Sequence, residues 1–89
     1  MTATIVLTKT MLDKRIIDAN ASVREWALKE FGVDYTTLNK KVQVTALVNN
    51  QPTVVRFYKT TRGDRRISIK DIGGIGGIGT TIILTTIGE

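Results

Sequence analysis

Three strand-like segments joined by short turns follow one another in the second half of the chain, and they limit the fold more than any other feature. Residues 42–48 alternate between two sets of side chains, which is the pattern of a half-buried strand. A turn at 49–52 leads to a second strand over 53–60, and a turn at 62–64 leads to a third over 65–71. Because such short connections join antiparallel neighbours, we expect an antiparallel sheet.

The first third of the chain has a different periodicity. Apolar residues recur there at steps of three and four, which is the spacing of an amphipathic helix. We predict one helix over 11–20 and a second over 23–31, the second opened by a capping box formed by Ser22 and Glu25. Gly32 suits the left-handed position that ends a helix.

Two further strands, over 3–8 and about 80–87, complete the prediction. Thr, Ile and Val make up more than a third of the 89 residues, and β-branched side chains favour strands. We therefore predict a small α+β single domain over residues 1–89. Its antiparallel four- or five-stranded sheet, or partly open barrel, is expected to pack on one or two helices.

The composition excludes several kinds of chemistry. The chain has no cysteine and no histidine, so it has no disulfide, no thiolate or imidazole metal ligand and no histidine base. Its aspartates show no paired-carboxylate spacing that would hold a catalytic metal. We expect a protein without catalytic activity, metal or cofactor.

Positive charge is concentrated in one segment. The formal net charge is +5, and the fifteen residues from Arg56 to Lys70 account for all of it. A localised basic patch attracts polyanions, of which nucleic acid is the commonest. The basic side chains of this segment, which Asp64 alone opposes, are Arg56, Lys59, Arg62, Arg65, Arg66 and Lys70.

The hairpin around Gly63 supports a prediction of register. The residues expected to face the core are Val55, Phe57, Ile67 and Ile69. If Phe57 and Ile69 are partners, Tyr58 pairs with Ser68 and Arg56 pairs with Lys70. Two cations directly opposite one another are unfavourable in water, so a negative partner covering them would make sense of this ladder. The outward face is then expected to hold Arg56, Tyr58, Thr60, Arg66, Ser68 and Lys70. Lys59 would lie on the core side and extend to the edge.

Residues 22–42 resemble the helix-turn-helix of DNA-binding proteins. In this resemblance Gly32 permits the turn, Asp34 caps a short second helix over 35–41, and Leu38 and Val42 lock that helix against the first. The resemblance implies that this second helix would meet the major groove or its phosphates. The residues it would present are Tyr35, Thr36, Asn39 and Lys40.

A glycine-rich segment matches a nucleotide-binding pattern only in its letters. Gly74, Gly76 and Gly79 have G-x-G-x-x-G spacing, but a strand is expected next, whereas the dinucleotide motif needs a helix. We interpret residues 73–79 as a tight connection whose neighbouring isoleucines fill the core. A backbone cradle for phosphate stays open as an alternative.

These features predict a small non-catalytic nucleic-acid-binding protein, with duplex DNA favoured over RNA. Phosphates would be held by the basic hairpin, through Arg56, Arg62, Arg65, Arg66 and Lys70, with Tyr58 packing on a sugar or base. Thr36, Asn39 and Lys40 would add contacts. The alternative is a protein-interaction module, a small inhibitor of a larger protein or a homo-oligomer subunit. It would use the basic face or the edge of strand 80–87.

No signal peptide and no run of 18 apolar residues is visible in the sequence. We therefore expect a cytoplasmic protein without a membrane partner.

Overall fold

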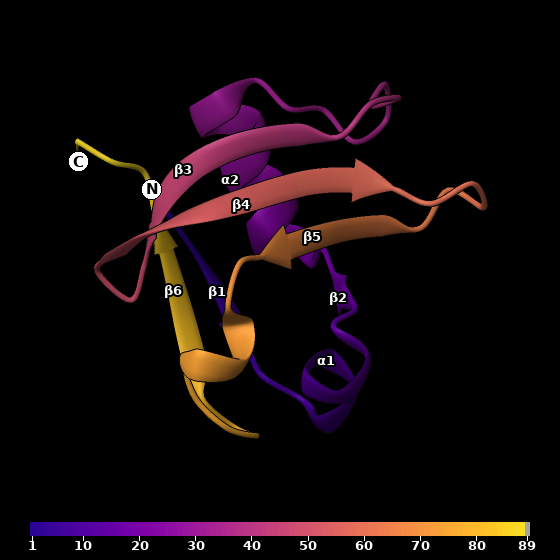
Figure 1. Cartoon of the computed structure of the whole chain (residues 1–89). Helices are drawn as coiled ribbons and strands as arrows, with labels where there is room; N and C mark the ends of the chain where they lie inside the picture. Colours follow the sequence, from indigo (N-terminus) through magenta and orange to yellow (C-terminus); the bar gives the residue numbers. More distant parts are fainter. Residues whose placement is uncertain (89) are drawn as a thin grey trace.

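The computed structural model describes residues 1–88 as an α+β fold in which six antiparallel strands form a curled half-barrel (Figure 1). The order of the strands across the sheet is β1-β6-β3-β4-β5-β2. This confirms the predicted fold class, with one strand more than expected. The strands are β1 (Thr2–Val6), β2 (Ile17–Asp18), β3 (Val42–Val48), β4 (Gln51–Lys59), β5 (Arg65–Ile69) and β6 (Thr81–Thr85). The helices are α1 (Lys9–Lys14), α2 (Ala21–Phe31) and the 3-10 turn η1 (Ile72–Gly74).

The additional strand, β2, lies where the sequence pattern predicts the helix over 11–20. Helix α1 stops at Lys14 because Arg15 adopts a left-handed conformation with φ of 56°. The next residues then pair with β5, where Ile17 lies opposite Ile67 and both are buried. The prediction of one helix here was wrong because burial of Ile17 in the sheet outweighs a weak local preference for helix.

Helix α2 begins at Ala21, and its N-cap, Asn20, differs from the predicted one. The Asn20 side chain accepts a hydrogen bond from the Val23 N–H at 2.9 Å, as an N-cap does. The Ser22 hydroxyl instead accepts the Thr4 N–H at the free edge of β1, at 3.0 Å. The predicted capping box was therefore wrong. Gly32, with φ of 66°, ends the helix as expected.

The predicted helix over 35–41 is also absent, since residues 35–37 form a turn. The Asp34 carboxylate accepts both the N–H and the hydroxyl of Thr36, at 2.9 and 2.7 Å. The Tyr35 hydroxyl donates to the Arg66 carbonyl at 2.8 Å, which ties this segment to β5. A segment with weak helix propensity follows these contacts rather than continuing as a helix.

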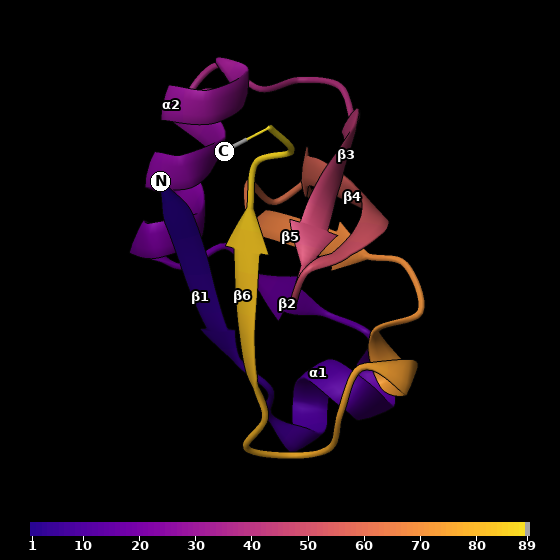
Figure 2. The same ribbon diagram turned by 90° about the vertical axis from the view of Figure 1, so that its left-hand side faces the viewer.

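The core lies between the inner face of the sheet and α2, which covers that face from behind (Figures 1 and 2). The indole of Trp26 is fully buried, 5.8 Å from the ring of Phe57, and its N–H donates to the Thr86 hydroxyl. The residues predicted to face the core in the hairpin are buried, namely Val55, Phe57, Ile67 and Ile69. This confirms the predicted faces of β4 and β5.

Strand β6 lies inside the sheet, with β1 on one side and β3 on the other. The prediction of a free edge at 80–87 was therefore wrong. Beyond the end of β3, Asn49 continues the hydrogen bonding to β6. Its N–H donates to the Ile83 carbonyl at 3.0 Å, and its Oδ1 accepts the Ile83 N–H at 2.8 Å. Asn49 and Asn50 both have positive φ, as a two-residue hairpin turn requires.

Replacing Asn49 by glycine tests how much its side-chain bonds to β6 contribute to stability. Glycine keeps the positive φ, so Asn49→Gly removes only the side-chain bonds to β6 and adds the usual entropy cost of glycine. We expect the free energy of unfolding to fall by about 1 kcal/mol more than in Asn50→Gly, which carries the same backbone change. Chemical denaturation followed by Trp26 fluorescence measures both. Equal stability of the two variants would show that the Asn49 side chain does not hold the edge.

Candidate nucleic-acid interface

Strands β3, β4 and β5 form a sheet section with four basic residues and no acidic one. Its inner face packs on the core, and its outer face is turned toward the viewer in Figure 1, away from α2. Side chains alternate along each strand, so Arg56 and Tyr58 lie on the outer face when Val55 and Phe57 are buried. Burial of the core residues therefore presents this part of the basic segment to solvent.

The register of the hairpin differs from the prediction by two residues. Arg56 lies opposite Ser68, and Tyr58 lies opposite Arg66. The cause is the turn: Thr60 pairs with Asp64, and Gly63 has φ of 90°, as in a three-residue loop with a glycine bulge. The predicted pairs of Arg56 with Lys70 and of Tyr58 with Ser68 were wrong.

Without a cation opposite it, the Arg56 side chain is held from the other neighbouring strand. Its Nε donates to Gln43 Oε1 on β3 at 2.9 Å. This bond positions the guanidinium on the outer face and leaves its charge uncompensated. Lys70 follows β5, its N–H bonded to the Val54 carbonyl at 3.1 Å, and it is exposed. Arg56 and Lys70 are therefore diagonal neighbours, whose Cα atoms we place roughly 8 Å apart from ideal strand spacings.

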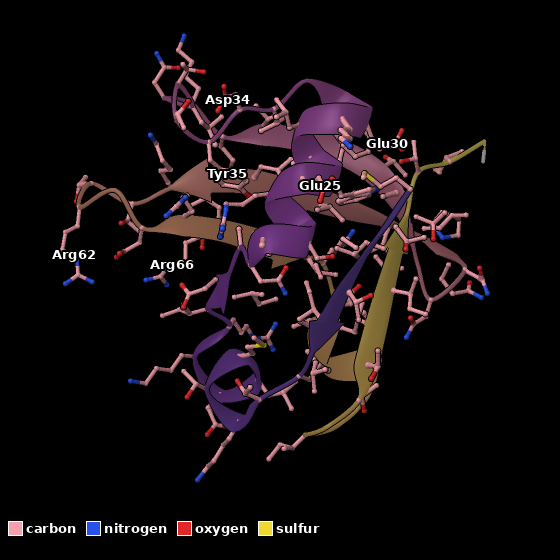
Figure 3. The ribbon with its side chains drawn as sticks, turned by 180° about the vertical axis from the view of Figure 1, so that it is seen from behind. Glu25, Glu30, Asp34, Tyr35, Arg62 and Arg66 are labelled. Carbon is pink, nitrogen blue, oxygen red and sulfur yellow. The ribbon has the colours of Figure 1, made fainter. Side chains whose placement is uncertain are left out.

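Two of the predicted binding residues are neutralised by carboxylates. Arg66 Nε lies 3.0 Å from Asp18 Oδ1, its Nη2 lies 3.3 Å from Asp64 Oδ2, and its side chain is only 14% exposed. Arg62, at the tip of the hairpin, forms a 3.0 Å ion pair with the same Asp64 oxygen (Figure 3). These contacts join β2, the start of β5 and the tip of the hairpin, and Arg66 is a structural rather than a surface cation.

A further cation joins the outer face from outside the predicted set. Lys41, just before β3, places its Nζ 5.3 Å from the centroid of the Tyr58 ring. Lys41 lies outside the basic segment, so the concentration of charge along the chain does not point to it. Side chains alternate between the two faces of β3, and extending this alternation back from Val42 to residue 41 indicates that Lys41 lies on the outer face. The outer basic face is defined here as Lys41, Arg56, Tyr58 and Lys70.

Arg65 is exposed but lies elsewhere. It is the cross-strand partner of Lys59, on the other side of the ribbon from Arg56. There it lines a polar hollow that also contains Arg24, Asp18 and Asp64. The structure therefore does not bring Arg65 together with the outer basic face.

The residues implied by the helix-turn-helix resemblance lie on a loop. The Thr36 hydroxyl donates to Asp34, and this bond together with the Thr36 N–H lowers the pKa of the Asp34 carboxyl. Tyr35 is buried, and burial raises the pKa of its hydroxyl. Asn39 and Lys40 are exposed and lie beside the end of β4, where they line a hollow together with Tyr58. They reach the candidate interface through a loop and not through a recognition helix.

The glycine-rich connection does not have the context of a nucleotide site. Strand β6 follows it, as predicted, rather than a helix. A Cβ on Gly76 would lie 2.5 Å from the Thr80 hydroxyl oxygen, so a close approach explains this glycine. Of its isoleucines, Ile72 is buried and Ile75 packs against the core, but Ile78 is 67% exposed, so the prediction that all three fill the core was wrong for Ile78.

The chain matches no protein-family model, no curated protein and no solved structure. Neither helix in residues 1–88 has the length and apolar character needed to cross a bilayer. Within the same residues, no three acidic side chains gather where they would hold a metal ion.

Removing Arg62 should change the titration of Asp64. The hydrogen bond from Arg62 is the main cause that lowers the pKa of Asp64 below 3.8, so Arg62→Gln should raise it toward that value. Because the folded pKa is depressed, the stability from Asp64 is present above the unfolded pKa and is lost as pH falls through the folded pKa. The Asp64 carboxyl chemical shift, followed by NMR against pH, gives the pKa of Asp64 in the wild type and in the variant. The Asp34 pKa should stay unchanged, and an unchanged Asp64 pKa would contradict the assigned cause.

Proposed function

We propose that this protein binds nucleic acid, with duplex DNA favoured, by holding phosphates on its outer basic face. One observation carries this proposal: Arg56 on β4, with Lys41 and Lys70 just beyond the ends of β3 and β5, lies on the outer face, and none of the three forms an ion pair within residues 1–88. Release of counterions from a polyanion drives binding to such a surface without a need for sequence recognition.

The residues of the outer basic face would make three kinds of contact with DNA. Arg56, already oriented by Gln43, offers the remaining guanidinium donors to one phosphate in a forked arrangement. Lys41 and Lys70 act as point charges for neighbouring phosphates. Tyr58, half-buried beside Lys41, supplies an aromatic surface for a sugar or base.

The shape of the hairpin favours DNA over duplex RNA. Strands β4 and β5 continue as a two-stranded ribbon whose tip projects beyond the rest of the sheet (Figure 1). The major groove of B-form DNA admits a two-stranded ribbon, whereas the major groove of A-form RNA is too deep and narrow for one. The exposed Arg65 near the tip would then approach a phosphate at the groove edge.

The opposite side of the molecule is unsuited to a polyanion. Helix α2 lies there and carries Glu25 and Glu30 (Figure 3). Glu25 pairs with Lys29 at 3.1 Å, so the helix adds little positive potential. Electrostatic attraction would therefore orient DNA toward the outer basic face.

Salt dependence of binding tests the electrostatic mechanism. Three phosphates bound on the outer basic face should give a slope of about −3 for log affinity against log salt concentration. Further contacts near the tip would make this slope more negative. The double variant Arg56→Gln with Lys70→Gln should flatten the slope by about 2 and weaken binding roughly 50-fold at 0.1 M salt. Fluorescence anisotropy with a labelled duplex at several salt concentrations measures both quantities.

The matched control removes two charges from the helices. Lys14→Gln with Lys29→Gln has the same net charge as the test variant, and we expect less than about a threefold change in affinity. Equal weakening in the two double variants would mean that only net charge matters. A wild-type protein that does not bind duplex, or binds with a slope near zero, would refute the proposed function.

A further inference from the structure

A hollow opens where β3 and β4 separate. The last pair of this ladder is Val42 with Phe57, and beyond it the segment 38–41 and the end of β4 diverge. The space between them is about 350 Å³, at the lower end of the roughly 300–1,000 Å³ range of ligand pockets. Its lining consists of Leu38, Asn39, Lys40, Lys41, Tyr58, Lys59, Thr60 and Thr61.

The fold itself keeps this hollow open. In residues 1–88 no hydrogen bond joins the segment 38–41 to the residues 58–61 across it. The loop is held instead at its base, where the Tyr35 hydroxyl donates to the Arg66 carbonyl and Leu38 packs against the core. On the other side, Thr60 is fixed by its pairing with Asp64. Both walls are therefore anchored outside the hollow, and the contact of Lys41 with the Tyr58 ring crosses it.

The chemistry of the lining is that of an anion site with an apolar wall. Three ammonium groups line it, on Lys40, Lys41 and Lys59, and none of the lining residues is acidic. The nearest carboxylate on the loop, Asp34, is engaged by the N–H and hydroxyl of Thr36, although its charge is also felt by Lys59. Half-buried Leu38 and the ring of Tyr58 supply the apolar part.

We infer that this hollow binds one unpaired nucleotide at the end of a bound duplex, an inference that rests on the proposed function. The lysines would hold its phosphate, and the base would lie against Leu38 and the Tyr58 ring. An inorganic anion would use the lysines alone and leave the apolar wall uncovered. The contact of Lys41 with the Tyr58 ring is weak at an exposed position, so stacking of a base there would release Lys41 to the phosphate.

The hollow adjoins the outer basic face because Tyr58 and Lys41 belong to both. A strand held along Arg56 would reach the hollow by continuing past Tyr58 toward the tip of the ribbon. The single-stranded extension of a duplex would therefore enter the hollow while its paired part stays on the sheet. Such an extension should bind better than a blunt end.

The test compares two DNA probes and two variants of equal charge. A blunt duplex and the same duplex with a three-nucleotide dT overhang are titrated by fluorescence anisotropy. We expect the wild type to prefer the overhang about fivefold, from one stacked base and one further phosphate contact. Lys59→Gln should reduce that ratio to about one. Lys70→Gln, at the other end of the outer face, should weaken binding to both probes and keep the ratio at about five.

Each outcome decides between the two proposals. The nucleotide site is overturned if the wild type binds the overhang and the blunt duplex equally well. It is also overturned if Lys59→Gln, with unchanged thermal unfolding, keeps the fivefold preference for the overhang. In either case, binding of the duplex itself preserves the proposed function. A separate NMR titration uses thymidine monophosphate and inorganic phosphate. Shifts of the Lys40, Thr60 and Thr61 amides that are larger with the nucleotide support the site even if duplex binding fails. Equal shifts with both probes, or none, count against it.

Discussion

Burial of Phe57 is the constraint from which the rest of the structure follows. Its ring meets Trp26 and Phe31 of α2 at 5.8 and 5.9 Å and Tyr35 of the loop at 6.3 Å, so a helix and a loop converge on one side chain of β4. Because neighbouring residues of a strand point to opposite faces, burial of Phe57 directs Arg56 and Tyr58 outward. The contact with Tyr35 also holds the loop beside the end of β4. The same ring therefore positions both the outer basic face and one wall of the hollow.

Carboxylates divide the basic segment into a structural and an exposed part. Asp18 and Asp64 both pair with Arg66, and Asp64 also pairs with Arg62, so these arginines join β2, β5 and the tip of the hairpin. Each exposed pair contributes little to stability, but the pairs distinguish Arg62 and Arg66 from Lys41, Arg56 and Lys70, which form no ion pair within residues 1–88. A count of charges along the segment treats all of its cations as equivalent, whereas their partners make them different.

The edges of the sheet are closed by side chains as well as by strands. Asn49 forms hydrogen bonds with the part of β6 that lies beyond the end of β3. Ser22 and Asn20 form hydrogen bonds with Thr4 at the free edge of β1. The remaining edge strand, β2, has only two residues. Short or capped edges resist pairing with another chain.

The sequence by itself determined the strands of the hairpin, the buried faces of β4 and β5 and the end of α2 at Gly32, because alternation and glycine conformations are local properties. Tertiary structure decided the rest. The pairing of Ile17 with Ile67 replaced a helix by β2, and the hydroxyl of Tyr35 held a turn where a recognition helix was expected. The bulged turn moved the register by two residues. Lys41 and Lys40 lie beside Tyr58 only because β4 returns along β3, a contact between residues distant in sequence that no local pattern records.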